Sequence, residues 1–99
     1  MSYTLYPSKV FLNQLLEFNE QEKHLILEKL ELAKLNPFRY KSLHAPGSTK
    51  TFEIKLTLKG IYSRLVYWIE GKEIKIAGII THNNNFRDLV KLLFDAQNE

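Results

Sequence analysis

Glu53, Lys55, Arg64 and His82 are of the types that cleave phosphodiester bonds, and they fall within one stretch of the sequence. Arginine can hold a phosphate through two parallel hydrogen bonds, and lysine can stabilise the charge that builds up in a transition state. Histidine titrates near neutral pH and suits proton transfer. Glutamate is either a general base or an ion partner of the lysine. This set favours cleavage of RNA by attack of a 2′-hydroxyl on the neighbouring phosphate, with no requirement for a metal.

Three strand-like runs must position these side chains. They cover residues of about 50–58, 61–70 and 73–81, and the tight turns Lys59-Gly60 and Glu70-Gly71-Lys72 separate them. Short glycine-containing turns between such runs are typical of antiparallel neighbours. The sequence therefore predicts an antiparallel meander.

Alternation along these strands places the candidate side chains. Successive residues of a strand point to opposite faces, so Glu53 and Lys55 lie opposite the apolar residues that alternate with them. We expect the apolar residues to pack under helices and Glu53 and Lys55 to lie on the open face. Arg64 is expected on that face too, because an arginine in the core would need a partner. His82 ends the last strand, where a loop can turn it over the same face.

The rest of the chain supplies helices. Residues 3–6 read as a first strand, followed by Ser8 as an N-cap and a short helix. Asn19, with Glu22 three residues later, opens a second helix that ends before Pro37. Residues 37–49 are predicted as a loop. A final helix follows the asparagines at 83–85, capped by Asn85 with Asp88, and its apolar stripe is Leu89, Leu92 and Leu93.

This order of elements predicts an α+β fold. An N-terminal strand and a two-helix hairpin would pack on an antiparallel sheet of about four strands, with a short C-terminal helix. With 99 residues, we expect one domain, residues 1–99.

Composition excludes several classes of protein. The chain has no cysteine, which rules out a disulfide scaffold, a thiol nucleophile and a thiolate metal site. Its three histidines are scattered, without the spacing of a zinc site. No apolar run approaches the roughly 20 residues that span a bilayer, and no signal sequence is evident. The net charge of +3 favours a polyanionic partner. We expect a cytoplasmic protein without a cofactor and without membrane contact.

Other residues carry weaker signals. The basic residues around the predicted loop and the last helix are expected to contact RNA: Arg39, Lys41, Lys50 and Arg87. The alternatives are structural. Glu53 and Lys55 suit a solvated strand face, and Arg64 suits a structural ion pair. Tyr62, Tyr67 and Trp68 suit sheet packing more than base stacking.

The arrangement resembles the RelE/ParE superfamily of toxin–antitoxin toxins over nearly the whole chain. The strand and helix hairpin match in order and length, and Asn36-Pro37 followed by Lys41-Ser42-Leu43 is similar to the family's linker. Three strand segments carry the rest of the likeness: Phe52-Glu53-Ile54-Lys55-Leu56, then Arg64-Leu65-Val66-Tyr67 after a glycine turn, and Ile76-Ala77 through His82.

The resemblance implies a function. The RelE and YoeB-like branches cut mRNA on the ribosome without a metal, and an acidic antitoxin neutralises them. Arg64 then matches the phosphate-binding arginine, Lys55 a catalytic lysine and His82 the catalytic histidine of the YoeB-like branch. We expect an endoribonuclease that inhibits translation, with mRNA, the ribosome and an antitoxin as partners, and a toxin–antitoxin hetero-oligomer on operator DNA.

Several positions depart from the family's pattern. Glu53 stands where a second lysine is common, and Ser63 replaces a tyrosine. Asn83 and Asn84 occupy positions that are often arginine, and Phe86 aligns with a terminal tyrosine. These departures leave two alternatives open: a ParE-like inhibitor of DNA gyrase, and a catalytically degenerate member that binds an antitoxin.

Overall fold

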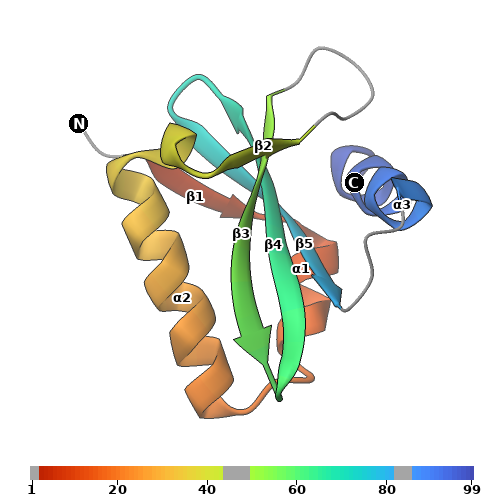
Figure 1. Cartoon of the computed structure of the whole chain (residues 1–99). Helices are drawn as coiled ribbons and strands as arrows, with labels where there is room; N and C mark the ends of the chain where they lie inside the picture. The colour runs from red at the N-terminus through yellow and green to blue at the C-terminus, as the bar shows by residue number, and fades with distance from the viewer. Residues whose placement is uncertain (1–2, 44–49, 82–85) are drawn as a thin grey trace.

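The computed structural model of the chain describes residues 3–43, 50–81 and 86–99. Helices and strands follow one another as β1 (Thr4–Pro7), α1 (Lys9–Leu15), α2 (Glu20–Leu35), the 3-10 helix η1 (Pro37–Arg39), β2 (Lys41–Leu43), β3 (Thr51–Leu58), β4 (Ile61–Glu70), β5 (Glu73–Thr81) and α3 (Phe86–Gln97). Figure 1 shows α2 along one side of the sheet and α3 on the other. The predicted α+β fold is confirmed.

The sheet has five strands in the order β1-β5-β4-β3-β2. The predicted meander is present, since β3 pairs antiparallel with β4 and β4 with β5. Two features differ from the prediction: β1 pairs with β5 in parallel, and β2 adds an edge strand beside β3. The first strand can be parallel to β5 because a helix hairpin and three strands separate them in the chain.

The prediction of a loop over residues 37–49 is wrong for its first half. Pro37 begins η1, because a proline suits the first position of a helix, and the Asn36 side chain accepts a hydrogen bond of 3.2 Å from Phe38 N. Lys41–Leu43 then forms β2 by pairing with Thr51–Glu53. Such a short strand depends on a partner distant in sequence, so a local pattern does not reveal it.

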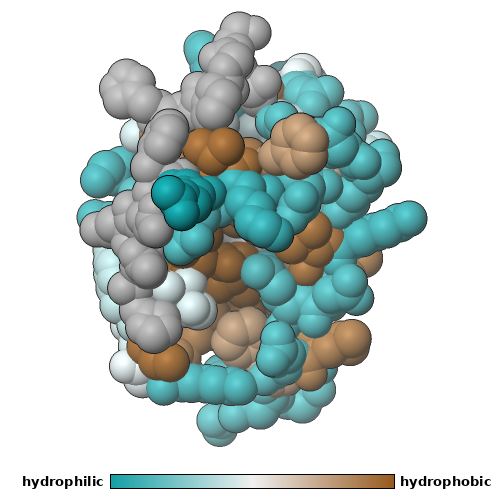
Figure 2. Space-filling view, turned by 90° about the vertical axis from the view of Figure 1, so that its right-hand side faces the viewer, coloured by the Kyte–Doolittle hydropathy of each residue, from teal (hydrophilic) through white to brown (hydrophobic). Residues whose placement is uncertain are grey.

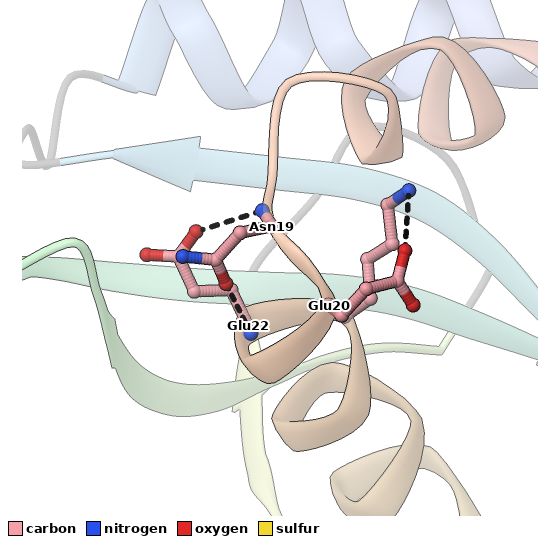
Figure 3. Close-up of polar contacts among 4 residues, drawn as sticks. Asn19, Glu20 and Glu22 are labelled. Carbon is pink, nitrogen blue, oxygen red and sulfur yellow. Dashed lines mark hydrogen bonds and ion pairs between the residues drawn. The ribbon is translucent and has the colours of Figure 1, made fainter.

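The helix starts follow the predicted capping chemistry. Ser8 Oγ accepts a 3.0 Å hydrogen bond from Phe11 N at the start of α1. Asn19 and Glu22 form a capping box at the start of α2, with hydrogen bonds of 2.9 and 3.1 Å between each side chain and the other residue's backbone (Figure 3). The predicted caps at Ser8 and Asn19 are confirmed. The predicted cap at Asn85 lies outside the described residues.

Two apolar clusters cover the two faces of the sheet. Under α1 and α2, the alternating residues of β3 pack against helix residues, as predicted: Phe52, Ile54, Leu56 and Leu58 with Phe11, Ile26, Leu30 and Ala33. On the opposite face, the apolar stripe of α3 packs on β4 and β5: Leu89, Leu92, Leu93 and Ala96 with Val66, Trp68 and Ala77. The face that carries the candidate site is therefore partly covered by α3.

Beyond its pairing with β1, the edge of β5 is covered by the side chains of Ser8 and Gln14, the N-cap and a residue of α1. Because β1 is short, α1 runs beside the second half of β5. Ser8 Oγ donates to Ala77 O at 2.8 Å, Gln14 Nε2 donates to Ile79 O at 2.9 Å, and Ile79 N donates to Gln14 Oε1 at 2.7 Å. These bonds satisfy backbone groups that a neighbouring strand would otherwise need to reach.

Gly78 lies at this junction, and Gly78→Ala is expected to destabilise the fold. Its φ of 152° disfavours a side chain, and an added Cβ would lie 2.7 Å from Gln14 Oε1 and 2.8 Å from Leu92 Cδ1. Overpacking of this kind costs about 1–3 kcal/mol, to be measured by urea unfolding. Gly71→Ala is the control, since its φ of 60° is also positive but nothing lies within 4 Å of the added Cβ. Equal losses for both variants would contradict the proposed clash.

Candidate phosphate-binding site on the sheet

Lys55 and Arg64 lie directly opposite each other in neighbouring strands. They are Cα partners in the antiparallel ladder of β3 and β4. Partners across such a ladder share a face, with Cβ atoms about 4.5–5.5 Å apart. The two cations therefore point to the same side of the sheet, as the alternation predicts. Lys55 is exposed, whereas the Arg64 side chain keeps only 18% of its surface exposed.

Glu53 is buried, and the prediction that it lies on an open face is wrong. Its side chain has no exposed surface. Two neighbouring strands enclose it, because Lys41 of β2 is its direct partner and Arg64 of β4 reaches it diagonally. Arg64 Nε lies 3.0 Å from Glu53 Oε2, and Lys41 Nζ lies 3.8 Å from Oε1. Strand β2, which lies beside β3 and helps to bury Glu53, was not predicted from the sequence.

The contact between Arg64 and Glu53 is an ion pair with poor hydrogen-bond geometry. At 3.0 Å the atoms are close, yet neither oxygen of Glu53 accepts a hydrogen bond from the described part of the protein. We treat the contact as charge attraction, because hydrogen bonds weaken steeply when the donor points away from the acceptor. The contact involves Nε, one of the five N–H donors that a guanidinium carries at three nitrogens.

Tyr62 completes the surroundings of Arg64. The guanidinium carbon lies 5.8 Å from the centre of the Tyr62 ring, within the range of a cation–π interaction. Tyr62 is two residues before Arg64 in β4 and is 46% exposed. The expectation that its ring packs into the sheet is therefore wrong. The alternation of β4 places it on the same face as Arg64, which is the signal that could have included it in the site.

The charges of this face leave it cationic. Lys41, Lys55 and Arg64 surround a single carboxylate, so two positive charges are uncompensated within the group. Farther along β4, the same face continues into Val66 and Trp68, which α3 covers. Figure 2 shows the side of the molecule that carries α3, where apolar surface lies among charged and polar side chains. The two uncompensated charges suit a phosphate, because charge-assisted hydrogen bonds to phosphate oxygens are strong.

Two of the predicted RNA contacts point elsewhere. Lys50 Nζ lies 5.7 Å from the Phe38 ring, and that ring packs at 5.7 Å against Phe52, on the face of the sheet that α1 and α2 cover. Arg39 lies over the Tyr40 ring at 5.4 Å, and Tyr40 packs against that same side. The structure therefore does not bring Arg39 and Lys50 to the Lys55–Arg64 face. Lys41 does reach it, through Glu53.

The last two predicted site residues follow β5. Arg87 is exposed near the start of α3. His82 lies outside the described residues. Its neighbour in sequence, Thr81, is the last residue of β5 and pairs with Ser63, which precedes Arg64 in β4.

Tyr67 is excluded from acid–base chemistry. It is fully buried on the face of the sheet that α1 and α2 cover, and its hydroxyl donates a 2.5 Å hydrogen bond to Pro37 O. Burial raises the pKa of Tyr67 well above its usual range, and the nearby Tyr40 adds to the rise. Tyr67 therefore packs the sheet, as predicted, and its hydrogen bond also holds η1, which was not predicted.

A separate cavity of about 440 Å³ opens on the side of the sheet near β1 and the end of α3. Two pairs of lining residues contact each other: Trp68 Nε1 donates to Glu70 Oε2 at 2.5 Å, and Lys75 lies over the Tyr6 ring at 4.7 Å. The cavity does not include the Lys55–Arg64 pair.

The described residues form neither a metal centre nor a membrane-spanning helix. No three His, Asp or Glu side chains gather there in a way that could hold a metal ion. Within the same residues, no helix has the length and apolar character needed to cross a membrane.

Comparison with known proteins identifies a similar fold in a solved structure. No model of a known protein family matches the sequence, and no curated protein matches it. A solved structure does match: the free state of the Escherichia coli toxin RelE with two arginines replaced by alanine. The TM-score is 0.68, the alignment covers 99% of this chain and 97% of that one, and the sequences are 17% identical. The chain therefore has a RelE-like fold, as its resemblance predicts.

Proposed function

We propose that this protein is the toxin of a toxin–antitoxin pair and cleaves mRNA on the ribosome. The observation that carries the proposal is the position of Lys55 directly opposite Arg64 on the sheet of a RelE-like fold. Two neighbouring cations on a rigid sheet offer a preorganised site for a phosphate and for the extra negative charge of the transition state.

The residues divide the chemistry as follows. Arg64 holds the phosphate, and Lys55 stabilises the charge on its non-bridging oxygens. The 2′-hydroxyl oxygen bonds to phosphorus, the bond from phosphorus to the 5′-oxygen breaks, and a 2′,3′-cyclic phosphate forms. The 2′-hydroxyl loses one proton and the 5′-oxygen gains one. We assign proton transfer to His82, on the basis of its sequence position alone.

The proposed partners follow from this role. mRNA on the ribosome is the substrate, and an acidic antitoxin would neutralise the basic domain. We further propose that the toxin and antitoxin form a hetero-oligomer on operator DNA and that the protein acts in the cytoplasm. Lys41 and Arg87 are the proposed additional contacts to RNA, because both are exposed.

Regulated expression in a bacterial host tests the proposal. Induction of the wild-type chain is expected to arrest growth, and primer extension is expected to show new 5′ ends within translated mRNA. The variant Lys72→Met provides a control for expression level, since Lys72 lies in the β4–β5 turn, away from the site. Arrest with intact mRNA and altered supercoiling would instead indicate an inhibitor of DNA gyrase. Normal growth at full expression would indicate a protein without toxin activity.

A further inference from the structure

We infer that Glu53 is a positioning residue that holds the guanidinium of Arg64, and that it does not act as the general base. The kinetic part of this inference rests on the proposed function, but the positional part does not. The starting observation is that a carboxylate with no exposed surface lies 3.0 Å from Arg64 Nε.

Geometry argues against a role as base. A base must come within about 2.6–3.2 Å of the hydroxyl that it deprotonates. The oxygens of Glu53 are enclosed by Arg64 on one side and Lys41 on the other, and Arg64 itself is only 18% exposed. A 2′-hydroxyl could reach Glu53 only after Arg64 had moved away, and that movement would remove the phosphate-binding group.

Energetics argue against a role in stability alone. Neither oxygen of Glu53 accepts a hydrogen bond within the described structure. Removing a carboxylate from water is expensive, and neutral residues often replace buried ion pairs without loss of stability. An under-bonded buried charge therefore needs another explanation.

The contact through Nε supplies that explanation. Glu53 contacts the guanidinium through Nε, and we infer that the edge formed by the two terminal nitrogens stays available to a phosphate. That edge carries parallel N–H groups that match two oxygens of a phosphate. The Tyr62 ring, 5.8 Å from the guanidinium carbon, provides a second contact to the guanidinium. A guanidinium held in this way loses little freedom when substrate binds, which favours a productive geometry.

The variant Glu53→Gln tests the inference kinetically. It keeps the shape of the side chain and removes its charge. Single-turnover cleavage of ribosome-bound mRNA is expected to slow by about 10- to 100-fold, the loss that follows a misplaced contact group. The pH–rate profile is expected to keep both limbs at their wild-type positions. Loss of one limb would identify Glu53 as the base, and an unchanged rate would mean that it positions nothing. Either result overturns the inference.

A second measurement does not depend on activity. The Nε–Hε signal of Arg64 in ¹⁵N-labelled full-length protein is expected to shift in Glu53→Gln, because the carboxylate charge 3.0 Å from Nε is removed. The matched control is Glu73→Gln, which removes the partner of Lys75 on β5 and should leave the Arg64 signal unchanged. An Arg64 signal that is the same with and without the Glu53 charge overturns the positional claim.

The two measurements separate the two proposals. A wild-type protein that cuts no mRNA would refute the proposed function, while the Arg64 signal would still decide the role of Glu53. If Glu53→Gln fails to fold, Glu53→Asp keeps the charge on a shorter side chain. It is expected to slow cleavage less than a loss of charge would and to shift the Arg64 signal in part; wild-type values for both would overturn the inference.

Discussion

Replacing Lys55 by methionine is expected to slow cleavage by at least about 100-fold, the usual loss for one transition-state charge contact. The stability of the protein should stay near that of the wild type. Lys55 is exposed, and it makes no ion pair among the residues that the structure describes. Methionine keeps an unbranched side chain of similar length, so the change removes the ammonium group with its charge and N–H donors and keeps most of the apolar stem. Single-turnover kinetics and thermal unfolding measure the two effects separately.

Lys72→Met is the matched control for Lys55→Met. It removes the same charge from the turn that follows β4, and the six residue-to-residue steps along the strand from Arg64 to Glu70 place that turn roughly 20 Å from the site. A similar slowing in both variants would show that only the overall charge of the protein matters. Wild-type kinetics for Lys55→Met would remove Lys55 from the mechanism.

Replacing Arg64 by methionine is expected to lower the free energy of unfolding by about 3 kcal/mol. This variant leaves the fully buried Glu53 carboxylate with Lys41 as its remaining partner, at 3.8 Å. Removing one member of a buried pair is costly because the other charge stays buried and uncompensated. Urea unfolding provides the measurement.

A double-mutant cycle distinguishes this cause from lost packing. Adding Glu53→Gln to Arg64→Met removes the stranded charge and is expected to restore most of the lost stability. Lys75→Met serves as the comparison, because it breaks an ion pair with Glu73, which is 40% exposed. Loss of that pair should lower the free energy of unfolding by less than about 1 kcal/mol. A double variant as unstable as Arg64→Met alone would show that the guanidinium stabilises the fold by packing, independently of Glu53.

The sequence indicated the central part of the sheet because its signals are local. Alternating apolar residues in β3 and glycine turns at Gly60 and Gly71 indicate an antiparallel meander. The sequence predicted only that Arg64 shares the face of Lys55, because an arginine in the core would need a partner, and the direct pairing of the two residues comes from the structure. Caps at Ser8 and Asn19 are local in the same sense, since donor and acceptor lie three residues apart.

The features that the sequence did not reveal depend on contacts between distant segments. Strand β2 exists because Lys41–Leu43 pairs with β3, and that pairing in turn buries Glu53. The stripe of α3 indicated that the helix would dock, but no local signal specifies which face of the sheet it covers. The acid–base part of the site stays a prediction, because His82 lies outside the described residues.

The docking of α3 has a consequence for association of the protein with other chains. Its leucines cover Val66, Trp68 and Ala77, and Glu99 accepts hydrogen bonds of 2.7 and 3.0 Å from the backbone N–H groups of Lys9 and Val10. All of these contacts join the end of the chain to segments that precede it in sequence, so a sheet from which α3 has detached would expose an apolar strip. Such exposed apolar surface promotes aggregation, so docking of α3 protects the sheet from association with other chains.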